Sequence, residues 1–559
     1  MSFRIRFLPE DRSTVQDGPV DLFLAASQCD IWTEQPCGAR TACGKCRVQV
    51  TDGSAPVTSA DERLLTAEEV AGGWRLGCQL TLDRDATIAI PAQTRSTAAK
   101  SFGDDALFAR GIIANVEAAF ALTSSAGVGA AGAAGEGGEV CGVAVDIGST
   151  SLAAALTSLH TGRVMGTTSR VNPQVRYGAD IISRIHFAQE HGDGNALLHG
   201  AVIEAIGEMI AELASQAGID ATHVVAVACA GNATMTHAAV GADITPLGQA
   251  PYQGLFTNEV LIPARDFGWR THADATVIFL PLIGHHIGGD TVAAILACQM
   301  DRAERWQLLI DLGTNTEVVV GSARGLFATS TAAGPAFEGA NIEYGMRAAP
   351  GAIDRVRVLA SGRLVAGTVA NQPARGICGS GLIDAVAELH RAGVIATSGY
   401  MKSRDECLAS GVHPTLCERV INAPGAQRRV RFDGSVMLTA QDVRQLQLVK
   451  GSIAAGIALV LKHAGVRADE LDAVFIAGTF GSFVRKESVQ AIGLVPAIDP
   501  ERVHFVGNAA GVGARMALVD ARFRERARQI AAQCRYLELA GHPEYENAFV
   551  NAIPLGEWR

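Results

Sequence analysis

The sequence lacks the features that would place a protein in a membrane or on nucleic acid. It contains no uninterrupted apolar run of roughly 18 residues, so it predicts no transmembrane helix. Its N-terminal stretch has no apolar segment followed by a small-residue cleavage site, which argues against a secretory signal. Only 19% of the residues are charged, and the net charge is −10. Nucleic-acid binding needs clustered Lys and Arg, so we expect a cytoplasmic protein with no nucleic acid and no membrane as partner.

What the chain does have is length and apolar residues enough for several domains. Its 559 residues correspond to three or four domains at about 150 residues each, and 48% of them are apolar. The stretch at 123–138, TSSAGVGAAGAAGEGG, has almost no large side chains and predicts a flexible tether. We expect four parts: a small β-rich domain over 1–95, a linker over 96–139 with this tether, and two larger units over 140–300 and 301–559.

The pattern changes after residue 140 to apolar strands that end in Gly-rich turns and alternate with helices. Near-continuous apolar strands indicate a sheet covered on both faces, hence the α/β class. The stretches 146–156 and 311–321 echo each other as strand, Asp-x-Gly turn and second strand, which predicts a duplicated fold with one copy per lobe. The expected strands are 143–146, 224–228, 276–280, 308–311, 474–477 and 503–506, and the expected helices are 195–216, 380–392 and 441–464.

Four of the twelve cysteines form an ordered series near the N-terminus. Five residues separate the first two, two residues separate the second and third, and the fourth follows after 31 more: Cys37, Cys43, Cys46 and Cys78. A [2Fe–2S] cluster needs four thiolates, three from a loop and one from a distant strand. A structural zinc or a redox Cys-x-x-Cys pair are the alternatives, but a zinc ribbon usually has two such knuckles and this stretch has one. Cys29 lies off the pattern, and we interpret it as structural.

This cysteine spacing resembles that of ferredoxins with a five-residue first gap. The resemblance implies a β-grasp ferredoxin-like fold of the α+β class for residues 1–95. Related loops commonly begin Cys-Gly-Gly-x-Gly, whereas this chain has Ala39 and Thr41 at the two later glycine positions. The loop is therefore expected to be less free to adopt positive φ.

Three acid- or glycine-containing turns indicate a nucleotide site, although a Walker-type phosphate loop is absent. Asp146 and Asp311 each close a strand, and the turn that follows can place backbone N–H groups around a phosphate while the carboxylate holds Mg²⁺ through water. A third turn follows strand 474–477, where glycines would let a nucleoside lie against the backbone. The predicted nucleotide-binding residues are Gly148, Ser149, Thr150, Gly313, Thr314, Asn315, Gly478, Thr479 and Gly481.

The three turns, in this order, resemble the phosphate-1, phosphate-2 and adenosine motifs of the superfamily of sugar kinases, actin and large chaperone ATPases. The resemblance implies a two-lobed actin-like ATPase, with Asp146, Asp290 and Asp311 as catalytic acids. Asp290 resembles the acid on the first connecting helix that orients the attacking water, although it could also cap that helix. The glycines of 507–514 resemble the second connecting helix and are interpreted as serving a helix crossing.

Four further stretches resemble those of the reductive activators of corrinoid enzymes: 172–180 (NPQVRYGAD), 231–235 (GNATM), 333–339 (AGPAFEG) and 376–381 (GICGSG). The resemblance covers nearly the whole chain. It implies ATP hydrolysis coupled to transfer of one electron from the [2Fe–2S] cluster to a cobalt(II) corrinoid protein of a methyltransferase system, which restores cobalt(I). It also implies ATP and Mg²⁺ as cofactors, a reductase or small electron carrier as donor, and a homodimer. The tether could let the cluster domain swing between donor and acceptor.

Two other functions remain open from the residues alone. The first is a redox-sensing, chaperone-like ATPase that binds or remodels a partner without net electron transfer. The second is a small-molecule kinase with a ferredoxin domain, although the sequence shows no recognisable substrate pocket for it. Only the activator requires both ATP and the cluster for a redox product.

Overall fold

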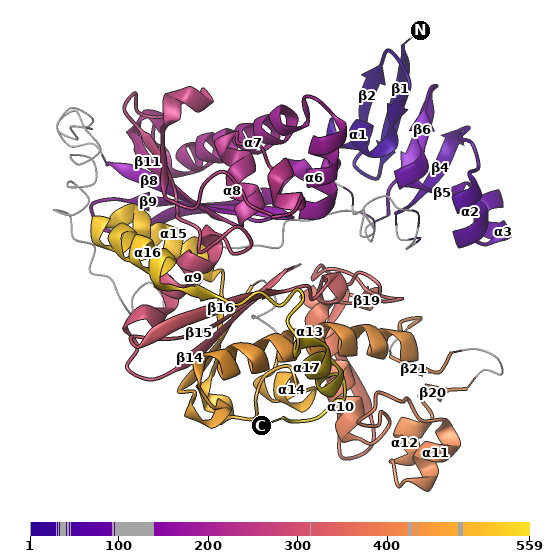
Figure 1. The fold of residues 1–559 in the computed structure, drawn as a ribbon. Helices are drawn as coiled ribbons and strands as arrows, with labels where there is room; N and C mark the ends of the chain where they lie inside the picture. The colour runs from indigo at the N-terminus through magenta and orange to yellow at the C-terminus, as the bar shows by residue number, and fades with distance from the viewer. Residues whose placement is uncertain are drawn as a thin grey trace.

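The computed structural model describes residues 2–29, 31, 33, 41, 44, 46–91, 94, 139–313, 315–422, 427–432, 434–478 and 484–558. Five of the predicted site residues lie outside these ranges, namely Cys37, Cys43, Thr314, Thr479 and Gly481, and so does the predicted tether at 123–138. Figure 1 shows two large lobes, with the small N-terminal domain beside the first of them.

The N-terminal domain is built on a five-stranded sheet in the order β2-β1-β7-β4-β5. Strands β1 and β7 pair in parallel and the other neighbours are antiparallel, with helix α1 packed against the sheet. Ile5, Phe7, Val48 and Ile88 are fully buried in its core. The elements are β1 (Phe3–Leu8), β2 (Arg12–Gln16), β3 (Val20–Asp21), α1 (Leu22–Ser27), β4 (Arg47–Gly53), α2 (Ser59–Leu64), α3 (Ala67–Ala71), β5 (Trp74–Leu76), β6 (Thr81–Leu82) and β7 (Ala86–Ala89).

The first lobe has a six-stranded sheet in the order β10-β9-β8-β11-β13-β12. Strand β9 pairs antiparallel with both β8 and β10, whereas β11 pairs in parallel with β8 and β13 in parallel with β11. Its elements are β8 (Cys141–Ile147), β9 (Ser151–Ser158), β10 (Val164–Val171), α6 (Ile181–Glu190), α7 (Gly194–Ala217), β11 (Val224–Gly231), α8 (Ala233–Val240), β12 (Val260–Pro263) and β13 (Thr276–Phe279).

The second lobe repeats this arrangement in the order β24-β23-β14-β15-β16-β25. Strand β15 pairs antiparallel with both β14 and β16, whereas β23 pairs in parallel with β14 and β24 in parallel with β23, in the same sequence order as in the first lobe. The predicted duplication is therefore confirmed. The elements are β14 (Gln307–Leu312), β15 (Thr316–Ser322), β16 (Gly325–Thr331), α13 (Ala440–Ala464), β23 (Ala473–Ala477), α14 (Lys486–Ala491), β24 (Val503–Gly507), β25 (Arg535–Tyr536) and α17 (Tyr545–Ala552).

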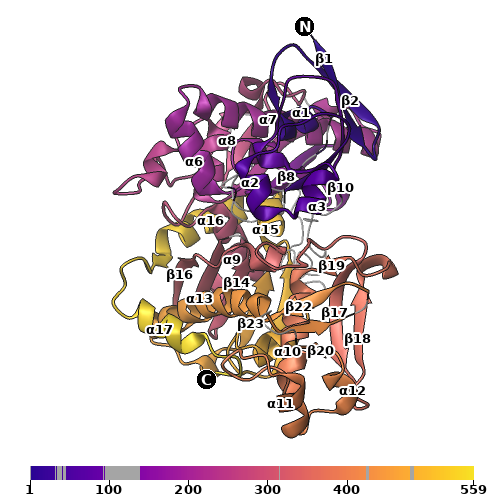
Figure 2. The same cartoon turned by 90° about the vertical axis from the view of Figure 1, so that its right-hand side faces the viewer.

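A smaller subdomain is inserted between β16 and α13, and Figure 2 shows its sheet β17, β18 and β19 along one side of the second lobe. It consists of β17 (Ala352–Val358), β18 (Leu364–Thr368), β19 (Gly376–Ile377), α10 (Gly379–Arg391), α11 (Arg404–Ala409), α12 (Pro414–Cys417), β20 (Val420–Ile421), β21 (Arg429–Arg431) and β22 (Met437–Thr439). Among the described residues, only helix α13 is long and apolar enough to cross a membrane, and 78% of its most apolar stretch is buried inside the protein.

Two helices join the lobes by crossing each other between the two sheets. These are α9 (Gly289–Cys298) and α15 (Ala509–Val519), and almost all of their side chains are buried. A β-carbon added at Gly513 would overlap the backbone carbonyl of Ala293, so the two helices touch backbone to backbone. The crossing predicted for these glycines is confirmed. Helix α15 also packs on the first sheet, where its Leu518 lies against Gly142 of β8. Helix α16 (Ala521–Gln533) follows it in the chain.

Candidate functional site

Two of the four predicted cluster ligands are described, and their thiols lie together. Cys46 Sγ and Cys78 Sγ are 3.2 Å apart, and neither forms a disulfide. The Gly77 N–H donates to the Cys46 carbonyl at 2.7 Å, which ties the turn before Cys78 to the start of β4. The hydrogen bond from Cys46 lowers the pKa of the Cys78 thiol, which favours the thiolate form that ligates iron.

The loop before these thiols departs from the sequence expectation at one position. Thr41 has a φ of 54°, the left-handed conformation in which a glycine would be free of strain. The Arg63 side chain donates to the Thr41 carbonyl at 3.0 Å and so helps to hold it. No group of three metal-ligating side chains gathers within the part of the chain that the structure describes. The other two predicted ligands, Cys37 and Cys43, lie outside that part.

The first predicted nucleotide turn connects β8 to β9, and the side chains of two asparagines donate hydrogen bonds to it. Asp146 is the last residue but one of β8 and is 1% exposed, and the Gly148 N–H donates to the Ser151 carbonyl at 3.1 Å. Asn172 Nδ2 donates to the Gly148 carbonyl at 2.8 Å, and Asn232 Nδ2 donates to Ser149 Oγ at 2.9 Å. Gly148, Ser149 and Thr150 remain half-buried, as residues that face a ligand would be.

The first connecting helix begins next to this turn. A β-carbon added at Gly288 would overlap the backbone of Gly231 and Asn232, so the start of α9 touches the same asparagine that holds Ser149. Gly288 is the N-cap of α9, and Asp290 lies inside the first turn, where one carboxylate oxygen accepts the Thr291 N–H at 2.8 Å. The interpretation of Asp290 as the helix cap is therefore wrong. A carboxylate in the first turn is still favoured by the helix dipole.

The second nucleotide turn contributes a group of acids that the sequence reasoning only partly identified. Asp311 is at the end of β14, and Glu317 is on the adjacent strand β15, where Ser330 Oγ donates to it at 3.2 Å. Burial, together with the negative charges of Asp290 and Asp311, raises the pKa of Glu317 well above its ordinary value. Glu317 was missed because only the pairing of β14 with β15 places it beside acids from two other elements. Its position six residues after Asp311, in the repeated turn, is the signal that could have suggested it.

The third turn adjoins the second. Gly478 has a φ of 101°, and a β-carbon there would overlap the Leu312 carbonyl of β14. Its N–H donates to the Gly507 carbonyl at 2.9 Å. Side chains at this position would push the third turn away from the second, which explains the glycine. Of the predicted residues at this turn, Thr479 and Gly481 are not among those described, so the structure locates only Gly478.

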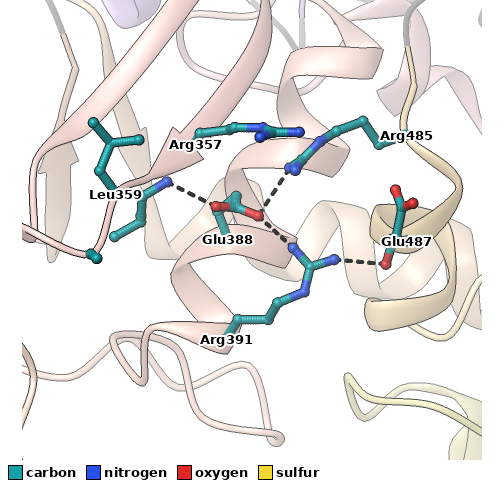
Figure 3. Close-up of a pocket in the computed structure, with 8 residues that line it drawn as sticks. Arg357, Leu359, Glu388, Arg391, Arg485 and Glu487 are labelled. Carbon is teal, nitrogen blue, oxygen red and sulfur yellow. Dashed lines mark hydrogen bonds and ion pairs between the residues drawn. The ribbon is translucent and has the colours of Figure 1, made fainter.

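The chain that leaves the third turn is anchored by a group of charged residues on α10. Arg485 donates to Asp384 at 3.1 Å and to Glu388 at 3.0 Å, and Arg391 also pairs with Glu388. Figure 3 shows Glu388, Arg391 and Arg485 in the lining of a pocket of about 540 Å³, to which Arg357 also contributes. These ion pairs hold the segment after the third turn against α10. The negative charge of Glu388 is balanced by Arg485 and Arg391 of the same chain.

A substitution at Glu317 tests the acid group. Because the folded protein raises the pKa of Glu317, it keeps a proton that the unfolded chain loses above about pH 4.5, so stability falls as pH rises toward the folded pKa. Glu317→Gln removes this titration. We expect the variant to lose less stability than the wild type between about pH 5 and pH 8 in denaturant unfolding without nucleotide. Glu204→Gln, on the exposed face of α7, is the control, and identical pH profiles for wild type and Glu317→Gln would contradict the assignment.

Comparisons with known proteins place the chain in a family. The model of the 2Fe-2S iron-sulfur cluster binding domain matches residues 8–83, that of the RACo middle region matches 141–303, and that of the C-terminal domain of RACo, the ASKHA domain, matches 305–557. The corrinoid activation enzyme RamQ of Eubacterium limosum is 32% identical over 426 residues, which are 75% of this chain and 71% of that protein. The chain belongs to the family of reductive activators of corrinoid enzymes.

A second relative and a solved structure also match most of the chain. The reductase of the Co(II) methylated amine-specific corrinoid protein of Methanosarcina barkeri is 25% identical over 442 residues, or 73% of this chain and 76% of that protein. A solved reductive activator for a corrinoid, iron-sulfur protein is 28% identical with a TM-score of 0.67, and the match covers 99% of this chain and 98% of that one. The predicted order of a [2Fe–2S] ferredoxin domain followed by an actin-like ATP-binding fold is confirmed.

Proposed function

We propose that this activator uses ATP hydrolysis to move one electron from a [2Fe–2S] cluster to a cobalt(II) corrinoid protein of a methyltransferase system, which returns the cobalt to its methyl-accepting cobalt(I) state. The proposal is carried by the combination, in one chain, of a ferredoxin domain and a two-lobed ATP-binding fold that together match a reductive activator over almost their whole length. The names of the relatives supply the class of partner, a corrinoid protein.

The proposal assigns roles to individual residues. When bound by Cys37, Cys43, Cys46 and Cys78, the cluster would supply a one-electron donor near about −400 mV. The three turns would hold the nucleotide through Gly148, Ser149, Thr150, Gly313, Thr314, Asn315, Gly478, Thr479 and Gly481. Asp146 and Asp311 would hold Mg²⁺ through water, and Asp290 would orient the water that attacks the terminal phosphate.

Electron transfer to protein-bound cobalt(II) runs uphill, which is why a nucleotide is needed. An unfavourable gap of about 100–200 mV requires roughly 2–5 kcal/mol for one electron. Hydrolysis can supply this only if the two nucleotide states differ in their affinity for the corrinoid partner. The relative position of the two lobes, which α9 and α15 join, is what would differ between these states, since Asp290 of α9 lies beside the acids of the second turn and the start of α9 lies beside the first.

Three further properties belong to the same proposal. A reductase or a small electron carrier would refill the cluster after each transfer, the activator would act as a homodimer, and it would work in the cytoplasm. The tether at 123–138 would let the cluster domain move between its donor and its acceptor. Shortening the tether should then slow ATP-dependent cobalt reduction without changing ATP hydrolysis.

An anaerobic assay of cobalt reduction tests the proposal. The reduced activator is mixed with Mg²⁺ and with the corrinoid protein encoded beside its gene, in the cobalt(II) state, and the cobalt(II) absorption is followed with and without ATP. We expect cobalt(I) only with ATP, and none with Asp146→Asn, whose cluster absorption should be intact. Asp274→Asn, an exposed acid remote from the turns, is the matched control and should behave as wild type.

Two outcomes would contradict the proposal. Equal cobalt(I) formation without ATP, or by Asp146→Asn, would separate the redox step from the nucleotide. ATP-dependent binding of the partner by a cluster-free Cys78→Ala variant, without cobalt reduction by the wild type, would support the redox-sensing, chaperone-like ATPase instead.

A further inference from the structure

Arg184 on helix α6 is a fully buried cation with only neutral hydrogen-bond partners. Its exposed fraction is 0%. It donates to the Gly178 carbonyl at 2.9 Å, to Gln174 Oε1 at 3.2 Å, to Met235 Sδ at 3.0 Å and to the Ser149 carbonyl. Within the described residues no carboxylate forms an ion pair with it. The acid that does act on it through space, Asp180, caps α6 by accepting the Ser183 N–H.

A buried charge without a counter-charge is unfavourable, because the protein interior replaces water poorly around an ion. This burial lowers the pKa of Arg184 to about 9, so the guanidinium remains charged at neutral pH. Such a group is retained in a fold when something else supplies the missing negative charge. In this activator the neighbour that can receive one is the first nucleotide turn, because Arg184 bonds directly to Ser149.

The turn is held so that its N–H groups point away from Arg184. Asn172 donates to the Gly148 carbonyl, and Arg184 donates to the Ser149 carbonyl, both from behind the turn. In a planar trans peptide the N–H lies opposite the carbonyl, so the N–H groups of Ser149 and Thr150 are directed to the other side. Successive N–H groups with this orientation form a concavity that binds anions. A cation on the carbonyl also polarises the peptide and strengthens its N–H as a donor.

We propose that Arg184 is a positioning residue for the nucleotide phosphates, which it recognises from behind the first turn by fixing the Ser149 peptide and by supplying the positive charge that the polyphosphate balances. This inference rests on the proposed ATP-dependent function and deepens it. The two stretches that resemble family motifs, 172–180 and 231–235, thereby acquire a physical role, because Gln174, Gly178 and Met235 from them accept hydrogen bonds from the guanidinium.

The role of Arg184 is tested by measuring how the full chain binds three ligands that differ in their number of phosphates. Adenosine, ADP and ATP are titrated into the wild type, Arg184→Gln, Arg184→Lys and a control, Arg176→Gln, which removes an exposed arginine from the neighbouring segment. We expect Arg184→Gln to weaken ATP by at least about tenfold and ADP by less, with adenosine changed by less than about twofold. Arg184→Lys, which keeps the charge, should restore most of the ATP affinity, and Arg176→Gln should match the wild type.

The pattern of losses separates a charge effect from a folding defect. Equal losses for adenosine and ATP in Arg184→Gln, or no rescue by Arg184→Lys, would overturn the inference while leaving ATP binding by the wild type intact. If the wild type itself bound adenosine but not ATP, both the inference and the proposed function would fail. Should Arg184→Gln not fold, Arg184→Lys decides alone: its ratio of ATP to adenosine affinity must stay close to that of the wild type, and a ratio lowered by about tenfold or more would overturn the inference.

Discussion

Cys78→Ala should leave the protein without its [2Fe–2S] cluster, whereas Cys29→Ala should keep a full one. The cluster needs four thiolates, and the Cys78 thiol already lies 3.2 Å from that of Cys46 with its pKa lowered toward the thiolate. Cys29 is a buried thiol of the same domain, 7% exposed, but it lies off the ligand spacing and packs in the hydrophobic core. The two variants therefore remove the same atom from the same domain with opposite consequences for the cluster.

Iron and sulfide per chain, together with visible absorption after anaerobic reconstitution, measure the difference. Cys78→Ala should also abolish cobalt reduction while it still binds ATP, because the nucleotide turns lie in the two lobes and not in this domain. A complete cluster in Cys78→Ala, or its loss in Cys29→Ala, would show that the ligand assignment is wrong.

Gly513→Ala should destabilise the protein strongly, whereas Gly200→Ala should stabilise it slightly. Both glycines lie within helices, so both substitutions gain helix propensity. A methyl group at Gly513 would overlap the Ala293 carbonyl at the crossing of the two connecting helices, and neither backbone can move away without separating the lobes. Overpacking of this kind costs about 1–3 kcal/mol and occasionally more. Around Gly200 no atom lies within 4 Å, so Ala there should add about 0.5–1 kcal/mol.

Urea unfolding in the presence and absence of ATP measures the free energy of unfolding. It checks both the expected loss of stability in Gly513→Ala and the expected gain in Gly200→Ala. The crossing also sets the separation of Asp290 from the acids of the second lobe, so we expect Gly513→Ala to lower ATP hydrolysis even at temperatures where it is folded. Equal stability of Gly513→Ala and the wild type would mean that the helices do not meet where the structure places them.

The elements were predictable wherever neighbouring residues decide the local conformation. The helices expected at 195–216, 380–392 and 441–464 are observed at Gly194–Ala217, Gly379–Arg391 and Ala440–Ala464. Apolar runs that end in Gly-containing turns likewise located the strand before each predicted nucleotide turn, since burial on both faces of a sheet demands such runs. The echo of 146–156 in 311–321 was enough to predict the duplicated lobes, and the cysteine spacing was enough to predict the ferredoxin domain.

The sequence by itself thus determined the order of domains and the cluster type, because each depends on residues close together in the chain. The three turns as the nucleotide site stay a prediction of the same local kind. Only the tertiary structure decided which side chains meet across elements. It placed Glu317 beside Asp290 and Asp311, and it made Gly288, not Asp290, the N-cap of α9. It also packed α15, which follows the second-lobe strand β24, against the sheet of the first lobe. It also enclosed Arg184 behind Ser149, 35 residues away. The burial of a side chain and the charges around it depend on tertiary packing. Packing brings together residues that are far apart in the chain, and no local sequence pattern indicates which residues these are.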